Sequence, residues 1–589
     1  MVHFLMNKLS NIIWNVRNGN LSSLRIEASA NMAGLYVSLF LVVFDNFAFW
    51  QAVNSALGSF SIKSIVFTGA FAVLLTGVIN LLIALISFKY LLKPILMVLL
   101  LTSATASYFM QHYGVMLDVT MLQNIIETNP DEAMELLGPG MYLHLVIFGV
   151  LPALILVRTH IVYKSLPREL LAKAGNILIT LCVVSLTMFA FYKELASFGR
   201  NNHVLSNLIN PLNYINALRR YGEQNLVQKR PIKDLGTDAY LLTQSAQRTR
   251  KNLTILVVGE TARASNYSLN GYTHNTNPKL ARQDIINYSN SWSCGTATAI
   301  SLPCMFSNLG REHYSDDEAK HQQNLLDVLQ HAGVQILWRE NNSGCKGVCA
   351  RVETHEIANS KDSEHCEAGE CYDDILLNNL QQYIDNLKQD TVIVFHLQGS
   401  HGPTYHLRYP DEFAVFKPFC NSNQLEDCTR EEVVNVYDNT ILYTDHVLNN
   451  VIELLKLNNT QFNTAMIYMS DHGESLGENG VYLHGLPYFI APDNQKHIPF
   501  IIWLSDQYAA NAGIDKTCLK ARSKQHYSHD NLFHSMLGLM NVGSITYKAE
   551  QDVFAPCNRS TARFLVQGGS GVKKETTNNS SHLSRSTLP

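Results

Sequence analysis

The chain has 589 residues, of which 47% are hydrophobic and 16% are charged, and its formal net charge at pH 7 is -4. This length exceeds what a single hydrophobic core organises, so two or more domains are expected. The nearly balanced charge excludes the strongly basic surface of a nucleic-acid-binding protein, and we expect no nucleic-acid partner.

Residues 28–193 are overwhelmingly apolar, whereas most of the charge lies after Lys193. Five stretches in this part carry few or no charges and have about the 17–25 residues that a helix needs to cross a bilayer. They are residues 28–44, 64–88, 94–117, 141–157 and 174–192. The sequence therefore predicts a membrane-embedded domain of five transmembrane helices over residues 1–193.

Basic residues are unevenly distributed over the loops between these stretches. The N-terminal arm and the second-to-third and fourth-to-fifth connections are basic, with Lys8, Arg17, Arg25, Lys89, Lys93, Arg158, Lys164, Arg168 and Lys173. The other two connections are poor in bases. The positive-inside rule therefore places the N-terminus in the cytoplasm, and five spans place the C-terminal half on the opposite side of the membrane.

The cysteines support export independently. Cys182 lies inside the fifth expected span, and the other ten of the eleven cysteines follow it. Their spacings do not repeat the C-x-x-C pattern of zinc-ligand clusters, so disulfides in an oxidising compartment fit better. Sequence does not determine connectivity, and we expect pairing of nearest neighbours: Cys294–Cys304, Cys345–Cys349, Cys366–Cys371, Cys420–Cys428 and Cys518–Cys557.

Residues 194–247 are expected to form an amphipathic segment and a linker. Apolar residues recur at helical spacing over residues 195–221, with an interruption at Asn210-Pro211. Because this segment directly follows a span, we expect it on the membrane surface, although the pattern alone fits a soluble core helix equally well.

From Asn252 onward, short apolar runs alternate with longer helical stretches. The expected strands are residues 253–258, 334–338, 391–395, 464–469 and 498–503, and the expected helices are residues 324–331, 373–387, 430–457 and 529–539. This alternation predicts an α/β domain over residues 248–567, with a mostly parallel sheet covered by helices on both faces. The polar Gly/Ser-rich tail, residues 568–589, is expected to be disordered.

Polar side chains follow three of the expected strands. Glu260 follows the first, His396 and His401 follow the third, and Asp471 and His472 follow the fourth. Ligands of open α/β sheets gather at the carboxyl ends of strands, so we expect these side chains to meet. Two carboxylates and one imidazole leave one tetrahedral position open, which is the pattern of a catalytic zinc. For the Asp-His pair alone, a strand capped by a polar loop is the alternative interpretation.

A candidate nucleophile lies between Cys294 and Cys304, in the small-residue segment GTATAISLP. This segment is able to open a helix. A hydroxyl there would face both a metal and the positive end of the helix dipole, which favour an alkoxide and bind phosphate oxygens. A threonine that caps a helix is the alternative interpretation.

Several long motifs carry a resemblance to a known family. They are VGETAR at 258–263, SCGTATA at 293–299, LPCMFS at 302–307, WRENN at 338–342, HGP at 401–403 and SDHGESLGE at 470–478. Together they closely resemble the lipid A phosphoethanolamine transferases, which include polymyxin-resistance enzymes. The resemblance extends from the membrane spans to about Phe564 and covers nearly the whole chain.

The resemblance implies an alkaline-phosphatase-like periplasmic domain, anchored in the inner membrane. It implies Thr298 as the nucleophile and one tightly bound zinc ion, held by Glu260, Thr298, Asp471 and His472. It also implies contacts with phosphoethanolamine, or with a second and weaker metal, from Asn342, Lys346, His401 and His484. The donor-lipid site is expected around Tyr113, Asn124 and Glu127, and the roles of His396 and Glu474 stay open.

The implied activity is zinc-dependent transfer of phosphoethanolamine from phosphatidylethanolamine to a phosphate of lipid A, through a covalent intermediate on Thr298. Lys346 and His401 or His484 would neutralise charge on the transferred group, and the product would bind polymyxin more weakly. We expect a monomer. The alternatives are the same chemistry on a core sugar or glycan, a synthase of the lipoteichoic acid type, and a periplasmic phosphatase or sulfatase. A non-enzymatic receptor is a further alternative, but the expected zinc ligands are all present.

Overall fold

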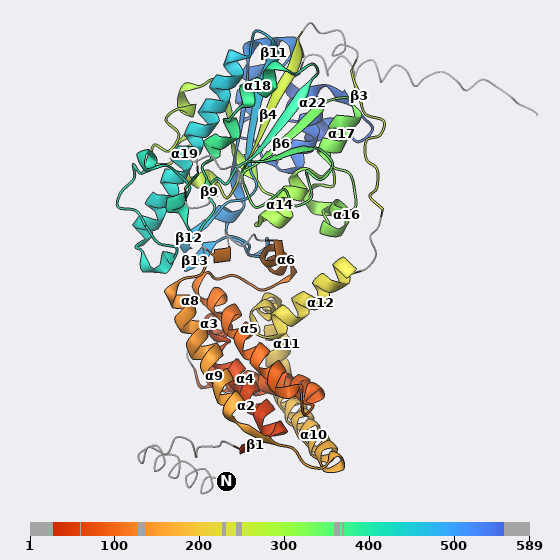
Figure 1. Cartoon of the computed structure of the whole chain (residues 1–589), viewed down its shortest axis with the longest axis vertical. Coiled ribbons are helices and arrows are strands. Elements are labelled where there is room, and N and C mark those ends of the chain that lie inside the picture. The colour runs from red at the N-terminus through yellow and green to blue at the C-terminus, as the bar shows by residue number, and fades with distance from the viewer. Residues whose placement is uncertain are drawn as a thin grey trace, which may run out of the picture.

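The computed structural model describes residues 27–58, 61–127, 133–134, 136–226, 231–242, 250–357, 366–367 and 370–558. A helical part, residues 27–226, lies below an α/β part, residues 231–558, in Figure 1. The tail that we expect to be disordered and the predicted boundary at residues 247–248 lie outside the described residues.

Among its described residues, the helical part contains four helices that are long and apolar enough to cross a membrane, or five spans if one bent pair of helices is counted as a span. The four are α4 (Ile62–Ile86), α5 (Leu92–His112), the continuous helix Pro139–Arg158 and α10 (Leu166–Ala190). The bent pair is α2 (Ala30–Phe44) and α3 (Phe47–Leu57), which meet at 57°. The continuous helix comprises α8 (Pro139–His144), a π-helical turn (Leu145–Val150) and α9 (Leu151–Arg158).

Two boundaries differ from the expected spans. The expected third span reaches residue 117, whereas α5 ends at His112 and the chain turns at Gly114, which has a φ of 70°. The expected fifth span starts at residue 174, whereas α10 starts at Leu166. The first turn of α10 carries charged residues, so a hydropathy criterion leaves it out of the expected span. The proline at its N-terminus is nevertheless compatible with a helix start.

The segment after α10 forms three helices. They are α11 (Tyr192–Asn201), a 3-10 helix (His203–Leu208) and α12 (Leu212–Leu226). The break at Asn210-Pro211 is where the sequence places it. Helix α12 packs against α6 (Val119–Glu127), and both lie at the junction between the two parts of the chain (Figure 1).

The α/β part is built on an eight-stranded sheet. Its order is β15 (Tyr527–Ser528), β5 (Ile285–Trp292), β14 (His497–Leu504), β11 (Phe462–Ser470), β4 (Lys251–Gly259), β10 (Thr391–His396), β6 (Gln335–Glu340) and β7 (Glu353–Glu356). Within this sheet, β14 runs antiparallel to both of its neighbours and every other pair is parallel. The predicted mostly parallel sheet is therefore confirmed.

Alternate residues of a strand point to opposite faces of the sheet. Apolar residues of the central strands therefore lie on both faces, and helices cover each face. On β4, Leu256 and Val258 pack in one hydrophobic cluster with α14 (Thr298–Met305), α17 (Leu325–His331) and α22 (Asp530–Met540). Ile255 and Val257 pack in a second cluster with α18 (Leu380–Asp385) and α19 (Arg430–Leu457). The central strands are consequently buried on both sides.

The remaining described elements are short. The helices are α15 (Gly310–His313), α16 (Asp316–Lys320), α20 (Asp506–Ala512) and α21 (Lys516–Arg522). Two-stranded ladders join β1 (Glu27–Ser29) to β2 (His160–Val162), β3 (Tyr240–Leu241) to β16 (Val542–Gly543), β8 (Cys366–Glu367) to β9 (Glu370–Cys371) and β12 (Ser475–Glu478) to β13 (Val481–Leu483).

One expected helix, residues 373–387, is wrong as a continuous element. A 3-10 turn over Asp373–Leu377 and the short helix α18 replace it. Asn379 between them has a φ of 57°, and this left-handed conformation interrupts a right-handed helix. The expected strands also omit β5, β7 and β15, whose polar residues do not give an apolar run.

The ten cysteines of the α/β part form five disulfides between sequence neighbours, as the spacing led us to expect. The pairs are Cys294–Cys304, Cys345–Cys349, Cys366–Cys371, Cys420–Cys428 and Cys518–Cys557. Cys182 on α10 is a free and exposed thiol.

We therefore expect a thiol-alkylating reagent to label Cys182 alone when the folded protein is treated without a reductant. Reduction should lower the thermal unfolding midpoint, because loss of a native bridge costs about 2–5 kcal/mol. Peptide mass spectrometry of the alkylated protein checks the labelling. Several labelled cysteines in the unreduced α/β part would contradict the pairing.

Candidate active site

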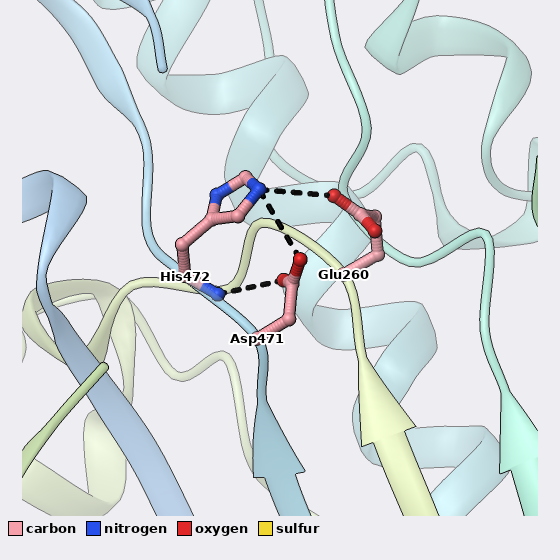
Figure 2. A group of neighbouring side chains, drawn as sticks. All are labelled: Glu260, Asp471 and His472. Atoms are coloured by element: carbon pink, nitrogen blue, oxygen red, sulfur yellow. Dashed lines mark hydrogen bonds and ion pairs between the residues drawn. The ribbon is translucent and has the colours of Figure 1, made fainter. Parts of the chain in front are cut away.

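The site forms where two adjacent parallel strands end. Strands β4 and β11 pair in register, with Gly259 opposite Ser470. Glu260 follows β4, and Asp471 and His472 follow β11, so the three side chains converge at one edge of the sheet (Figure 2). Their candidate ligand atoms lie within 4.8 Å of one another. All three residues are at most 1% exposed.

The imidazole of His472 lies close to both carboxylates. Its Nε2 is 3.4 Å from Oε1 of Glu260 and 3.2 Å from Oδ2 of Asp471. Its Nδ1 is 2.9 Å from the carbonyl oxygen of Gly473, which only accepts hydrogen bonds, so Nδ1 carries the proton. Burial, and next the charge of His484, lower the pKa of His472 well below its usual range and favour the neutral ring.

A neutral His472 thus directs the lone pair of Nε2 toward two buried carboxylates. Burial raises the pKa of Asp471 to about 6, although the backbone amides of Thr261 and His472 donate to its Oδ1 at 3.1 and 2.7 Å. A cation shared by the three groups would satisfy the lone pair and both charges. The oxygen, oxygen and nitrogen donors are a set that zinc accepts.

Two neighbours fix Glu260. The side-chain amide of Asn342 donates to Oε2 of Glu260 at 2.9 Å and to the carbonyl oxygen of Leu397 at 2.8 Å. Gly399 has a φ of 57°, and a Cβ atom there would lie 2.7 Å from the carbonyl oxygen of Glu260. The close approach of the loop after β10 therefore requires glycine at this position.

Thr298 is the first residue of α14, so the small-residue segment does open a helix. Its Oγ1 lies 3.2 and 3.3 Å from the carboxylate oxygens of Glu260 and 3.3 Å from Nε2 of His472. The hydroxyl thus lies beside the three clustered groups. The positive end of the helix dipole points in the same direction.

Two further histidines lie beside this cluster. The ring of His484 is 4.3 Å from that of His472 and 5.6 Å from that of His401, measured between centroids. His484 also contacts the buried carboxylate of Glu474, with Nδ1 3.1 Å from Oε2. Glu474 therefore orients His484.

His396 does not join the cluster. It is fully buried, and its Nδ1 lies 2.8 Å from Oε1 of Glu340, the last residue of β6. Glu340 also accepts from the indole of Trp338 at 2.8 Å and from the backbone amide of Asn342 at 2.8 Å. His396 thus belongs to a buried network that supports the loop of Asn342.

A cavity of about 740 Å³ extends from these side chains into the helical part. At one end it is lined by Thr298, Ser343, Lys346, His401 and His484. Mainly apolar residues of α5, α6, α8 and α12 line the rest, among them Leu101, Phe109, Leu122, Met141 and Leu218. The described residues therefore connect the polar site with an apolar space among the helices.

Of the three residues expected at the donor-lipid site, two line the cavity and one contacts the α/β part. Tyr113 and Asn124 line the cavity, whereas Glu127 is not among its lining residues in the described part of the chain. The carboxylate of Glu127 instead accepts from Gln123 at 3.0 Å and lies 3.5 Å from Nζ of Lys320. Its carbonyl oxygen accepts from Lys346 at 3.3 Å. Glu127 thus joins α6 to the α/β part.

Sequence reasoning assigned no role to two residues that line the site. Ser343 accepts from Nζ of Lys346 through its carbonyl oxygen at 3.2 Å and its hydroxyl at 3.3 Å. Leu483 precedes His484 and also lines the cavity. Serine and leucine are not typical of a metal or phosphate site. Only their positions near Lys346 and His484 in the sequence could have indicated that they line the cavity.

Comparisons with known proteins divide the chain in the same way. Residues 252–542 match the sulfatase family model, and residues 75–226 match that of phosphoethanolamine transferase EptA/EptB. The chain is 43% identical to phosphoethanolamine transferase EptA of Escherichia coli K12, over 91% of this chain and 98% of that protein. It is 36% identical to phosphatidylethanolamine transferase Mcr-1 of Escherichia coli, over 86% and 94%.

A solved structure matches both parts together. It is the integral membrane protein lipooligosaccharide phosphoethanolamine transferase A from Neisseria meningitidis, with a TM-score of 0.87 and 37% identity. The match covers 91% of this chain and all of that one. The α/β part thus has a sulfatase-type fold, joined to a helical membrane part. Within that class, the chain belongs to the phosphoethanolamine transferase family.

The approach of Gly399 to Glu260 predicts the effect of a methyl group. Gly399→Ala should destabilise the protein through the left-handed conformation, by about 1–2 kcal/mol, and through overlap with Glu260, by about 1–3 kcal/mol more. Gly333→Ala is the matched control, because Gly333 has a φ of 87° with nothing within 4 Å of a Cβ atom. Thermal unfolding should show the larger fall in midpoint for Gly399→Ala. Equal falls would contradict the contact.

Proposed function

We propose that this chain transfers phosphoethanolamine from phosphatidylethanolamine to a phosphate of lipid A, with Thr298 as the covalent carrier. One observation carries the proposal: the Thr298 hydroxyl lies 3.2–3.3 Å from Glu260 and His472 and also lines a cavity of about 740 Å³ that continues among the membrane helices. A nucleophile at the mouth of an apolar cavity suits a substrate whose headgroup reacts while its acyl chains stay in lipid.

Glu260, Asp471, His472 and the hydroxyl of Thr298 are the residues that would hold one zinc ion. The buried carboxylates and the inward lone pair of His472 support this assignment. Bound there, zinc would supply positive charge that lowers the pKa of the Thr298 hydroxyl and polarises a phosphoryl oxygen. His401 and His484 are the proposed ligands of a second, weaker metal.

Transfer then needs two displacements at phosphorus. Oγ of Thr298 attacks the phosphorus of phosphatidylethanolamine, the bond to the glycerol oxygen breaks, and diacylglycerol leaves with a proton. The proton lost by Thr298 balances the proton that diacylglycerol gains, and His401 or His484 would relay it when no second metal is bound there. An oxygen of the acceptor phosphate next attacks the phosphorus of the phosphoethanolamine ester on Thr298. The bond from phosphorus to Oγ breaks, and Oγ takes up the proton that the acceptor phosphate loses.

The remaining polar residues would position the phosphoryl group. Lys346 would turn from the carbonyl oxygen of Glu127 toward the transferred group and neutralise its charge. Asn342 contacts Glu260, which supports a positioning role for it rather than direct contact with phosphoethanolamine. Tyr113 and Asn124 line the cavity, which supports their proposed place near the donor lipid.

The names of relatives support the choice of substrates. Mcr-1 is named for phosphatidylethanolamine, and the Neisseria meningitidis protein is named for lipooligosaccharide. We place the enzyme in the inner membrane as a monomer, with a cytoplasmic N-terminus and a periplasmic α/β part. Addition of phosphoethanolamine to lipid A would mask negative charge and weaken the binding of polymyxin.

The carrier role predicts that Thr298→Ala abolishes transfer while the unfolding midpoint stays close to wild type, because only one side chain is shortened. Thr298→Ser is the matched control and should keep measurable activity, since it retains the hydroxyl. Thin-layer or mass-spectrometric analysis of lipid A checks both variants. Transfer by Thr298→Ala at more than a few per cent of the wild-type rate would reject the carrier.

The ligand assignment predicts that one zinc ion per chain survives purification and that Asp471→Ala or His472→Ala removes it. His355→Ala is a suitable control, because His355 is an exposed histidine on β7. Elemental analysis of the purified proteins measures the metal content. Full zinc occupancy in either ligand variant would contradict the proposed coordination.

A further inference from the structure

A disulfide-closed loop of the α/β part, residues 420–428, lies against the helical part of the chain. The Cys420–Cys428 bond closes it, and a 3-10 turn over Leu425–Asp427 lies within it. Thr429 directly after the loop caps the N-terminus of α19 by accepting from the amide of Glu432 at 3.3 Å. The loop is therefore firmly joined to the longest helix of the α/β part. We call residues 420–428 the docking loop.

Gln424 of the docking loop makes a buried hydrogen bond across the junction. The hydroxyl of Tyr108 on α5 donates to Oε1 of Gln424 at 2.6 Å, although the two residues are 316 positions apart in the sequence. Gln424 is 6% exposed and Tyr108 is 1% exposed. A buried hydrogen bond leaves an unsatisfied polar group when either partner is removed, so this contact opposes separation of the two parts.

Gly138 makes room for the same side chain. A Cβ atom at Gly138 would lie 2.2 Å from Nε2 and 2.5 Å from Cδ of Gln424. Its φ of -125° and ψ of 168° are open to any residue, so a methyl group at this position would act by displacing the side chain of Gln424 and not through the backbone. The start of α8 and the amide of Gln424 are thus fitted to each other.

Apolar packing continues across the junction around this hydrogen bond. Tyr108, Tyr113 and Met141 of the helical part belong to the same buried hydrophobic cluster as Leu425 of the docking loop and Val436 of α19. At the edge of the contact, Nε2 of His112 lies 3.7 Å from Oε1 of Glu426. Buried and continuous packing of this kind favours one defined orientation of the two parts over free motion on a tether.

The docked surface leads to the active site. Val481 of β13 lies 3.8 Å from the position of a Cβ atom at Gly114, just after α5. Two and three residues later in the chain, Leu483 and His484 line the cavity beside Thr298. On the paired strand β12, Glu478 lies opposite Val481. Glu478 accepts from Arg263 at 2.7 Å and lies 3.7 Å from Arg430, the first residue of α19. The start of α19 therefore lies beside both the docking loop and the hairpin that leads to His484.

We propose that the docking loop is the interface that seats the α/β part on the helical part, with Gln424 as a positioning residue that holds the Thr298 site over the cavity. Its partner is the surface formed by Tyr108, Gly138 and Gly140 of the same chain. The consequence for lipid transfer rests on the proposed function, whereas the interface itself does not.

Two glycines provide a matched test in the full-length protein. A Cβ atom at Gly138 overlaps Gln424, whereas one at Gly140 lies 3.4 Å from its Oε1, an ordinary contact. Gly138→Ala should raise hydrogen exchange of the backbone amides of residues 421–428 by about tenfold or more, which corresponds to a loss of about 1.4 kcal/mol. Gly140→Ala should exchange like wild type. Equal exchange in the two variants would overturn the interface.

Kinetics separate positioning from general destabilisation. In mixed micelles, Gly138→Ala should reduce the rate of transfer from phosphatidylethanolamine at least tenfold, because small misplacement of reacting groups is costly. Zinc content should stay close to that of the wild type. A variant that loses zinc and transfer together has a damaged site, and this outcome would overturn the positioning role. Wild-type protein without any transfer would reject the proposed function, yet hydrogen exchange would still decide the interface.

A double-mutant cycle tests whether Tyr108 and Gln424 act through their shared hydrogen bond. Tyr108→Phe and Gln424→Ala should each increase exchange of residues 421–428, and the double variant should increase it no further than the larger single effect. Independent, multiplying effects would show that the two residues act separately and would overturn the role of this bond.

Discussion

Glu260 and Asp471 are neighbours because β4 and β11 run parallel and in register, with Gly259 opposite Ser470. Every other feature of the site depends on this pairing. It brings two carboxylates and the lone pair of His472 together in a place from which water is excluded. Burying these negative charges without a cation costs free energy. The pairing also leaves a gap beside the cluster that the first residue of α14 fills with the Thr298 hydroxyl.

The polar ends of the central strands could be predicted from the sequence because each follows an uninterrupted apolar run. Glu260, Asp471 and His472 are therefore found without a structure, and so is the helix that Thr298 opens. The place of Glu127 could not be predicted, because an acidic residue in a loop looks the same whether it faces a lipid or Lys320. His396 was ambiguous for a similar reason, since its partner Glu340 is more than fifty positions away in sequence and becomes a neighbour only when β6 and β10 pair.

The junction between the two parts of the chain is not visible in the sequence. No pattern links Tyr108 to Gln424 or explains why Gly138 is a glycine, because both facts depend on two surfaces that meet only in the folded protein. The same junction supports the proposal that the membrane helices do more than anchor the enzyme. Their apolar side chains continue the cavity that begins at Thr298, so the headgroup of the proposed lipid substrate and its acyl chains would have one continuous path.

Thr298 is the proposed carrier of the phosphoethanolamine group between two lipids. The most direct measurement is incubation of the full-length enzyme with phosphatidylethanolamine and no acceptor, followed by mass spectrometry of the protein and analysis of the lipids. The account predicts phosphoethanolamine on the peptide that contains Thr298 and one diacylglycerol released for each modified chain. Diacylglycerol release that appears only when the acceptor is present, with no modified Thr298 peptide, would contradict it and would favour direct transfer between the lipids.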